Sequence, residues 1–133
     1  LGAGSVLERK TITSLTKLEI DFFVSPGVIT TRQPKKQNYL PGVLTPTEIL
    51  ECKNFSVLKL FPSNSLEIIN YLKTINGPFP NLKFIPTGGI NIKNYFSIIS
   101  LPNVLGVAGS FIYPKNKKNK IDFLKLKKIL TII

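Results

Sequence analysis

The stretch Ser56–Pro62 (SVLKLFP) decides the fold class, because it is a short apolar run with one lysine at its centre and a proline at its end. Successive side chains of a strand point to opposite faces, so Lys59 shares a face with Val57 and Phe61, and the two leucines share the other. Both faces are otherwise apolar, which is typical of a strand covered on two sides in a parallel sheet. The stretch therefore predicts a buried parallel strand that carries a lysine.

A lysine in such a strand has two interpretations. Burial disfavours the ammonium form, and a neutral amine is a nucleophile toward carbonyl carbons. Alternatively, Lys59 lies near the strand end and its side chain reaches solvent. The stretch by itself favours the second interpretation. The motifs in the rest of the chain favour the first.

Composition places the chain among globular proteins and excludes several chemistries. Its 133 residues, 43% of them hydrophobic, are enough for one domain with a core. There is no histidine, which removes Ser-His-Asp triads, Cys-His dyads and histidine metal sites. The single cysteine, Cys52, excludes an internal disulfide and suits a reducing compartment. The sequence contains no signal-peptide pattern and no apolar run long enough to cross a bilayer.

The net charge of +11, from 18 basic and 7 acidic residues, raises the possibility of a nucleic-acid or anionic-membrane surface. The excess is nearly all lysine, however, since Arg9 and Arg32 are the only arginines. Joint enrichment in Lys, Asn and Ile is typical of an AT-rich coding sequence. We therefore predict no nucleic-acid and no membrane partner. A basic binding module built on Lys115–Lys120 and the last helix is kept as an alternative.

Strands and helices are predicted to alternate along the whole chain. Strands are expected to begin near residues 21, 39, 57, 82 and 104, and a proline or glycine such as Pro41–Gly42 is expected to stop each one. Helices are expected over residues 8–20, 28–38 (short and irregular), 45–55, 64–75, 91–100 and 121–133. This alternation predicts a parallel sheet in one α/β domain, with functional residues at the carboxyl edge of the strands.

Two glycine turns follow the last two predicted strands, at Thr87–Gly89 and at Gly109–Ser110. Glycines allow close backbone approach, and free N–H groups bind anions. In (β/α)8 barrels the loops after the last two strands frequently bind phosphate. Other nucleotide motifs fail, because Gly2–Gly4 lacks the third glycine of a dinucleotide fingerprint and neither turn leads into Gly-Lys-Ser/Thr.

Taken in order, these motifs resemble the 2-keto-3-deoxy-6-phosphogluconate (KDPG) and 4-hydroxy-2-oxoglutarate (KHG) aldolases. The matching segments are Gly2–Leu7 (GAGSVL), Phe23–Gly27 (FVSPG), Leu40–Val43 (LPGV), Lys59–Pro62 (KLFP), Gly77–Phe79 (GPF), Pro86–Ile90 (PTGGI) and Gly109–Ser110. The similarity runs from Leu1 to about Tyr113. It implies a class I aldolase on a (β/α)8 TIM barrel, cytoplasmic, usually a homotrimer, and needing no metal or other cofactor.

The resemblance assigns roles to ten residues. Lys59 is implied to form a Schiff base with the 2-keto group of pyruvate, with Phe61 packed beside it. Ser5 stands where the family usually has threonine, and Thr87 matches a residue that helps to set stereochemical preference. Substrate binding is implied for Ser5, Pro26, Pro41, Phe61 and Thr87, and phosphate binding for Gly88, Gly89, Gly109 and Ser110. For each glycine and proline, plain turn geometry is the alternative.

The resemblance also shows what the chain lacks. In the family, a glutamate that transfers protons and an arginine that holds the pyruvate carboxylate both lie upstream of the segment that matches Gly2–Leu7. Neither is present, and Glu8, Asp21 and Glu48 do not replace the glutamate. The chain contains no methionine and opens within a motif. A whole barrel needs on the order of 200 residues or more. We therefore expect residues 1–133 to be the C-terminal part of one barrel domain, namely the last five βα units with Leu1–Leu7 as the end of the third strand.

The implied reaction is cleavage of a phosphorylated keto acid. KDPG would give pyruvate and glyceraldehyde 3-phosphate, and 4-hydroxy-2-oxoglutarate would give pyruvate and glyoxylate. An inactive remnant of such an aldolase is the alternative.

Overall fold

The computed structural model describes residues 2–18, 20–32, 38–64 and 67–112. Its elements, in chain order, are β1 (Gly2–Ala3), α1 (Arg9–Lys17), β2 (Phe22–Val24), β3 (Asn38–Leu40), β4 (Gly42–Val43), α2 (Pro46–Glu51), β5 (Val57–Leu60), α3 (Ile68–Ile75), β6 (Lys83–Pro86), α4 (Tyr95–Ile99) and a 3-10 turn, Ser110–Ile112. The expected last helix, Ile121–Ile133, and the basic segment Lys115–Lys120 lie outside the described residues.

All the named strands pair in parallel, as the alternation predicts. One sheet has the order β1-β2-β3 and the other the order β4-β5-β6. Only Pro41 separates β3 from β4, so one extended segment belongs to both sheets. As predicted, β3 ends at Leu40, directly before Pro41, but Gly42 begins β4 and does not stop the extended segment. Proline has no N–H to donate to a ladder, and the chain changes its pairing partner at that residue instead of ending.

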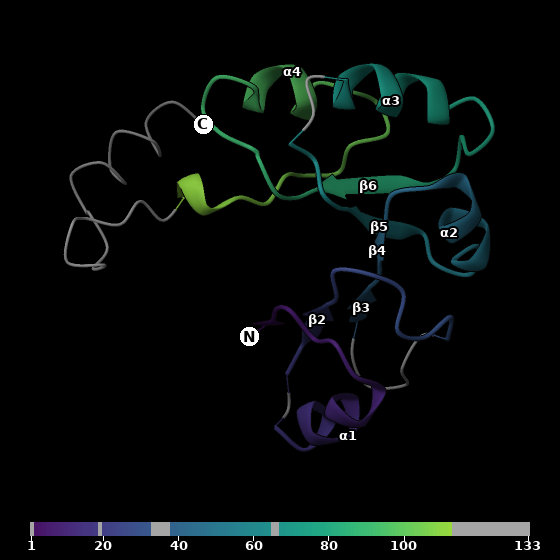
Figure 1. The fold of residues 1–133 in the computed structure, drawn as a ribbon, viewed down its shortest axis with the longest axis vertical. Coiled ribbons are helices and arrows are strands. Elements are labelled where there is room, and N and C mark those ends of the chain that lie inside the picture. Colours follow the sequence, from purple (N-terminus) through teal and green to yellow (C-terminus); the bar gives the residue numbers. More distant parts are fainter. Residues whose placement is uncertain (1, 19, 33–37, 65–66, 113–133) are drawn as a thin grey trace.

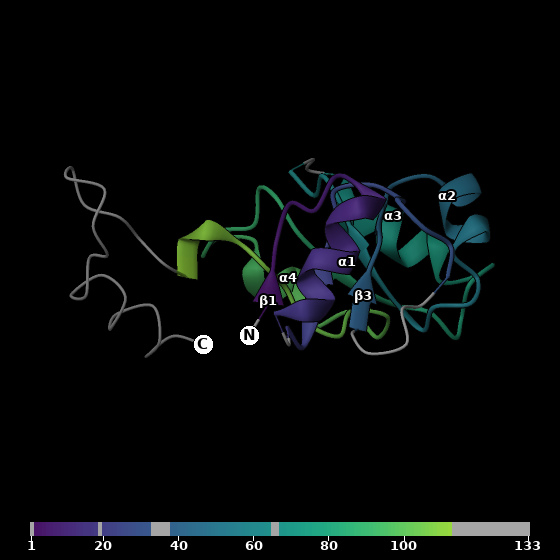
Figure 2. The same cartoon turned by 90° about the horizontal axis from the view of Figure 1, so that it is seen from below.

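The predicted strand at residues 104–108 forms only two isolated parallel bridges to the β6 side, Phe84↔Val104 and Thr87↔Ala108. Backbone bonds from Leu105 N to Phe84 O (3.0 Å) and from Ala108 N to Pro86 O (3.0 Å) hold it there. The segments thus lie beside one another in their chain order. Figure 1 shows the strands between α3 and α4 on one side and α1 on the other, and Figure 2 shows α1 beside β1 and β3.

The helix that the sequence predicts best is α2. Thr45 Oγ1 accepts from Glu48 N (3.3 Å), and Glu48 Oε2 accepts from Thr45 N (2.8 Å), which completes a capping box. All four named helices, α2 included, are shorter than expected. The irregular helix predicted over residues 28–38 is not found at residues 28–32, which form bends, and residues 33–37 lie outside the described part.

The core lies between the helices and one face of the strands. Leu58 and Leu60 of β5 are fully buried there, together with Phe84 of β6 and Leu72 of α3. The opposite face of β5 carries Lys59, so the predicted division of side chains between the two faces is confirmed. Within the described residues, no helix has the length and apolar character needed to cross a membrane.

Candidate active site

The strand face that carries Lys59 forms the wall of an open cavity of about 690 Å³. Its wall consists mainly of alternate residues from successive strands, which are Gly4, Ser5, Phe22, Val24, Asn38, Leu40, Val57, Lys59, Ile85, Thr87, Leu105 and Ala108. This wall is apolar apart from a few side chains, and Lys59 is its single charged group among the described residues. The cavity therefore presents one amine in an otherwise apolar wall.

Lys59 is 8% exposed, and its Nζ lies 4.2 Å from the centre of the Phe61 ring. Desolvation by burial lowers the pKa of the Lys59 ammonium below its usual 10.5. The side chain is thus held in the cavity wall rather than extended into solvent. Of the two interpretations of this lysine, the structure agrees with the first, a buried amine whose ammonium form is disfavoured by burial.

Thr87 and Ser5 contribute the hydroxyl groups of the described cavity wall. Thr87 N donates to Leu60 O (2.9 Å), and Thr87 Oγ1 donates to Ile85 O (3.2 Å), so its hydroxyl proton is occupied and its lone pairs remain for another donor. Ser5 has φ +56°, in the left-handed region that non-glycine residues rarely adopt. Such strain is frequent at binding sites.

The two glycine turns meet at the carboxyl edge, as predicted. Gly88 and Gly89 have φ of +85° and +79°, and a Cβ at Gly88 would lie 3.0 Å from the Phe61 ring. A Cβ at Gly109 would lie 3.1 Å from the carbonyl oxygen of Ile90, next to the first turn. Ser110, which follows, is exposed. These four residues are adjacent to the cavity but are not part of its wall.

Pro26 and Pro41 lie at strand ends but do not line the cavity. Pro41 is fully buried, and its carbonyl accepts a 2.9 Å bond from Lys59 N. The carbonyl of Pro26 lies so close to Gly42 that any Cβ there would overlap it. These prolines thus contact the backbone around Lys59 and do not contribute to the cavity wall.

Most residues of the cavity wall are not among those predicted from the sequence. Three pairs of wall residues are spaced two residues apart on one strand each, namely Phe22 and Val24, Asn38 and Leu40, and Val57 and Lys59. Such i, i+2 spacing is the signal that could have found them, because residues of one strand face alternate. To use this signal, one must also know which face of each strand lines the cavity, and the sequence does not show this.

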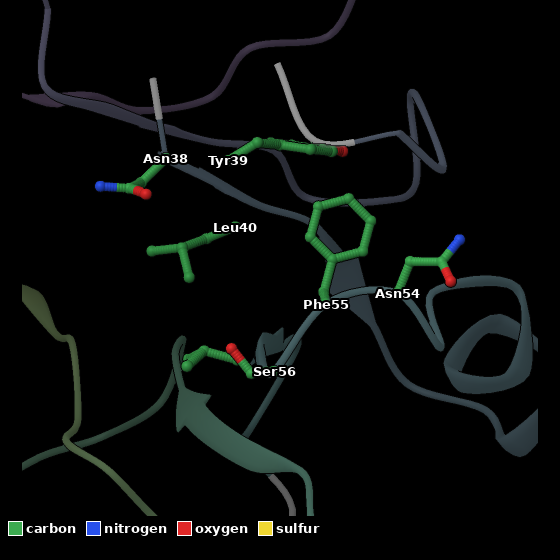
Figure 3. Close-up of a pocket in the computed structure, with 7 residues that line it drawn as sticks. Asn38, Tyr39, Leu40, Asn54, Phe55 and Ser56 are labelled. Carbon is green, nitrogen blue, oxygen red and sulfur yellow. The ribbon is translucent and has the colours of Figure 1, made fainter. Parts of the chain in front are cut away.

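A second cavity, of about 310 Å³, opens at the amino ends of β3 and β5. Its wall is Asn38, Tyr39, Leu40, Asn54, Phe55, Ser56 and Val57. Figure 3 shows the Asn38 and Asn54 amides at opposite sides, with the Phe55 ring between them. This wall includes no amine and no carboxylate, and no group of three or more Cys, Asp or Glu in the described part of the chain could hold a metal ion. The Lys59 cavity is therefore the candidate site.

The fold and this site define an α/β protein with a buried amine near the carboxyl edge of parallel strands. The family model of the KDPG and KHG aldolases matches residues 1–129. The chain belongs to this family of aldolases, which are lyases.

Relatives and solved structures agree with this assignment. A 2-dehydro-3-deoxy-phosphogluconate aldolase of Pseudomonas aeruginosa is 30% identical over 97% of this chain and 61% of its own length. The KHG/KDPG aldolase of Escherichia coli is 28% identical over 97% of this chain and 63% of its own. This chain thus spans about three fifths of the length of these curated relatives.

Two crystal structures show the same fold. The KDPG aldolase of Zymomonas mobilis has a TM-score of 0.85 at 28% identity, over 98% of this chain and 65% of that one. The KDPG aldolase of Legionella pneumophila, with pyruvate captured as a covalent carbinolamine, has a TM-score of 0.75 at 31% identity, over 98% and 63%. That enzyme forms a covalent adduct with pyruvate.

Proposed function

We propose that Lys59 forms an imine with the 2-keto group of a keto acid, and that the protein to which this chain belongs cleaves KDPG, 4-hydroxy-2-oxoglutarate or both. The observation that carries the proposal is the burial of Lys59 in the cavity, 8% exposed and with its pKa lowered by desolvation. The carbinolamine of the Legionella relative supports the same chemistry.

The proposed reaction uses the protonated imine on Lys59 as an electron sink. The neutral Nζ attacks the 2-keto carbon, and loss of water from the carbinolamine gives an iminium ion. A base takes the proton of the C4 hydroxyl, the C3–C4 bond breaks, and its electron pair enters the iminium to give an enamine and a free aldehyde. Protonation of the enamine at C3 and hydrolysis of the iminium release pyruvate and restore the lysine.

The other site residues have proposed roles around this amine. Thr87 and Ser5 line the same cavity and would contact the substrate hydroxyls. Phe61 packs against the ammonium. Gly88, Gly89, Gly109 and Ser110 would bind the phosphate at the carboxyl edge. For Pro26 and Pro41 the proposed role is to hold the strand ends around the site, which we base on their backbone contacts.

Trapping with borohydride tests the lysine directly. Pyruvate and sodium borohydride should add a stable alkyl group to one lysine, which peptide mapping should locate at Lys59. Lys59→Arg should abolish the label. Lys83→Arg is the matched control, because Lys83 lies on the neighbouring strand β6 but is exposed and donates to Pro102 O (2.8 Å). Label on any other lysine in the wild-type protein would contradict the assignment.

A specific observation favours one alternative, an inactive remnant that forms the imine but turns over poorly. The described wall of the cavity contains no carboxylate, and proton transfer by a positioned acid or base contributes about 10²–10⁴-fold to a rate. Trapping at Lys59 without measurable aldol cleavage would support this alternative. Trapping together with cleavage would support the active enzyme.

We propose that residues 1–133 belong to one barrel domain, and that the full-length protein is a cytoplasmic homotrimer whose partner is a small phosphorylated keto acid. Light scattering on the full-length protein tests the trimer. The basic binding module depends on residues outside the described part, and salt-dependent binding to nucleic acid would support it.

A further inference from the structure

Ser63 connects the strand of the proposed imine lysine to the turn that carries Thr87. It is fully buried, and its Oγ donates to Leu60 O (2.8 Å). The same oxygen accepts from Thr87 N (3.3 Å). The backbone N–H of Ser63 in turn donates to Thr87 O (3.0 Å) and Gly88 O (3.1 Å). Both backbone groups of Thr87 are therefore bonded to Ser63.

The hydroxyl of Ser63 is not needed to satisfy a buried backbone donor. Thr87 N already donates to Leu60 O at 2.9 Å, so the N–H would keep a partner if Oγ were removed. The hydroxyl adds two bonds, one to Leu60 O and one from Thr87 N, and these close a triangle of Leu60 O, Thr87 N and Ser63 Oγ. Leu60 directly follows Lys59, so this triangle fixes the distance between the lysine strand and Thr87.

The loops on either side of this triangle also interlock. A Cβ at Gly88 would lie 3.0 Å from the Phe61 ring, and a Cβ at Gly89 would overlap the backbone of Asn64. The loop after β5 and the loop after β6 are therefore packed into one unit, with Ser63 as its buried polar residue. Lys59 and Thr87 project from this unit into the same cavity.

We infer that Ser63 is a positioning residue that sets the place of Thr87 relative to Lys59 and thereby the preference between keto acids that are epimeric at C4. This inference rests on the proposed function. The bond that breaks joins C3 to C4, and C4 carries a hydroxyl. Thr87 Oγ1 donates its proton to Ile85 O, so its lone pairs are available to a donor in the cavity. The C4 hydroxyls of two epimers point in opposite directions, so we assign the hydrogen bond to Thr87 Oγ1 to one epimer alone.

The test compares two C4-epimeric 2-keto-3-deoxy-6-phospho sugar acids in borohydride trapping at subsaturating concentration. The rate at which each forms an adduct on Lys59, identified by mass, gives an epimer ratio that does not require turnover. Ser63→Ala should lower this ratio by about threefold to tenfold, the fold-change equivalent to one buried neutral hydrogen bond. A loss of overall stability would lower both rates together and leave the ratio unchanged.

Ser25→Ala is the matched control, because Ser25 is also fully buried but its hydroxyl bonds to Tyr39 and Gly27 instead. It should leave the epimer ratio unchanged. In a Thr87→Val background, Ser63→Ala should have no further effect on the ratio, since the effect passes through Thr87. If Ser63→Ala is insoluble, Ser63→Cys keeps the size and weakens the donor, and a smaller loss of the ratio is expected.

The outcomes separate this inference from the proposed function. Absence of any label on Lys59 in the wild-type protein would overturn the proposed function itself. Label on Lys59 with an epimer ratio near one, or with a ratio that Ser63→Ala leaves unchanged, would overturn only the role of Ser63.

Discussion

The backbone N–H of Lys59 donates a 2.9 Å hydrogen bond to the carbonyl of Pro41, the residue at which one extended segment passes from the first sheet to the second. The next bond of this ladder, from Phe61 N to Val43 O, measures 3.0 Å. The strand that carries the lysine is therefore fixed to the junction of the two sheets. This anchoring holds Lys59 on the cavity side, where burial lowers its pKa.

The lowered pKa predicts how imine formation depends on pH. The neutral amine is the reactive form, so the trapping rate with pyruvate should rise with pH and level off below the usual lysine pKa of 10.5. The measurement is the rate of cyanoborohydride trapping at Lys59 between pH 6 and 10.5, with Nα-acetyl-lysine as the reference amine. A midpoint equal to that of the reference would mean that burial does not activate this lysine.

The capping box of α2 predicts a pH-dependent stability. Glu48 Oε2 accepts from Leu44 N and Thr45 N, both at 2.8 Å, and these bonds lower the pKa of the carboxyl below its usual 4.5. Glu48→Gln should therefore cost about 1 kcal/mol of unfolding free energy at neutral pH.

The sign of the pH effect follows from the lowered pKa. The stabilisation by Glu48 is fully present above pH 4.5 and is lost as the pH falls through the folded-state value. Urea unfolding at pH 7 and pH 3 should show the difference between wild type and Glu48→Gln shrinking at the lower pH. Glu51→Gln on the same helix is the control, and an equal cost for both variants at pH 7 would contradict the capping role.

Cys52 should resist alkylation in the folded protein. Burial, followed by the charges of Glu51 and Glu48, raises the pKa of its thiol to about 11. Relative to an ordinary thiol with a pKa of 9.0, this leaves about a hundredfold less thiolate at pH 8. Iodoacetamide should label Cys52 rapidly in guanidinium chloride and very slowly in buffer. Equal rates in the two solutions would show that the Cys52 thiol is accessible to the reagent in the folded protein.

The sequence predicted well the features that depend on local pattern. Strand alternation placed Lys59 and Val57 on one face, and the residues Thr45 to Glu48 predicted their own capping box, because both depend on neighbours within a few residues. The change of sheet at Pro41 could not be predicted in this way. A proline ends a ladder only on the side where its N–H is missing, and its carbonyl still accepts from Lys59.

Contacts between loops far apart in the sequence were also beyond prediction. Ser63 and Thr87 are 24 residues apart, and nothing in the sequence around Ser63 indicates its bond to Thr87. Gly89 was expected to allow close approach of a phosphate, and the structure shows that it packs against Asn64. A turn glycine thus has a packing role that pattern alone does not reveal.

This packing decides how the proposed phosphate site is tested. Gly89→Asp would place a Cβ against Asn64 at a φ of +79°, so a loss of binding would not report charge. Ser110 is exposed, so Ser110→Asp adds a negative charge at the surface of the turn. It should raise the KM for the phosphorylated substrate by about tenfold or more, through repulsion of like charges. An unphosphorylated keto acid should be affected much less.

Ser110→Asn is the neutral control of the same size and should leave both KM values nearly unchanged. If cleavage is too slow to measure, the concentration dependence of trapping at Lys59 gives the same comparison. Equal losses for the phosphorylated and unphosphorylated substrates in Ser110→Asp would count against a phosphate site at this turn.

The open cavity predicts how residues 1–133 behave when they are expressed alone. Phe22 and Leu105 in its wall are 41% and 60% exposed, and in the described part of the chain β1 pairs only with β2. Exposed apolar surface and open strand edges promote association, and a whole domain has only about 5–15 kcal/mol of net stability. We therefore predict that this polypeptide does not form a stable monomer with ordinary aldolase turnover.

Light scattering, thermal unfolding and an aldol cleavage assay check this prediction, and a matched pair of variants tests its cause. Leu105→Lys should reduce association, because it places a charge in the cavity wall. Leu50→Lys, at a nearly equal exposure of 58% on α2, should not, because that residue lies on the helical side, away from the cavity. Equal effects of the two variants would show that the cavity face is not the surface that associates. A monomer that unfolds cooperatively and cleaves its substrate at an ordinary rate would contradict the prediction as a whole.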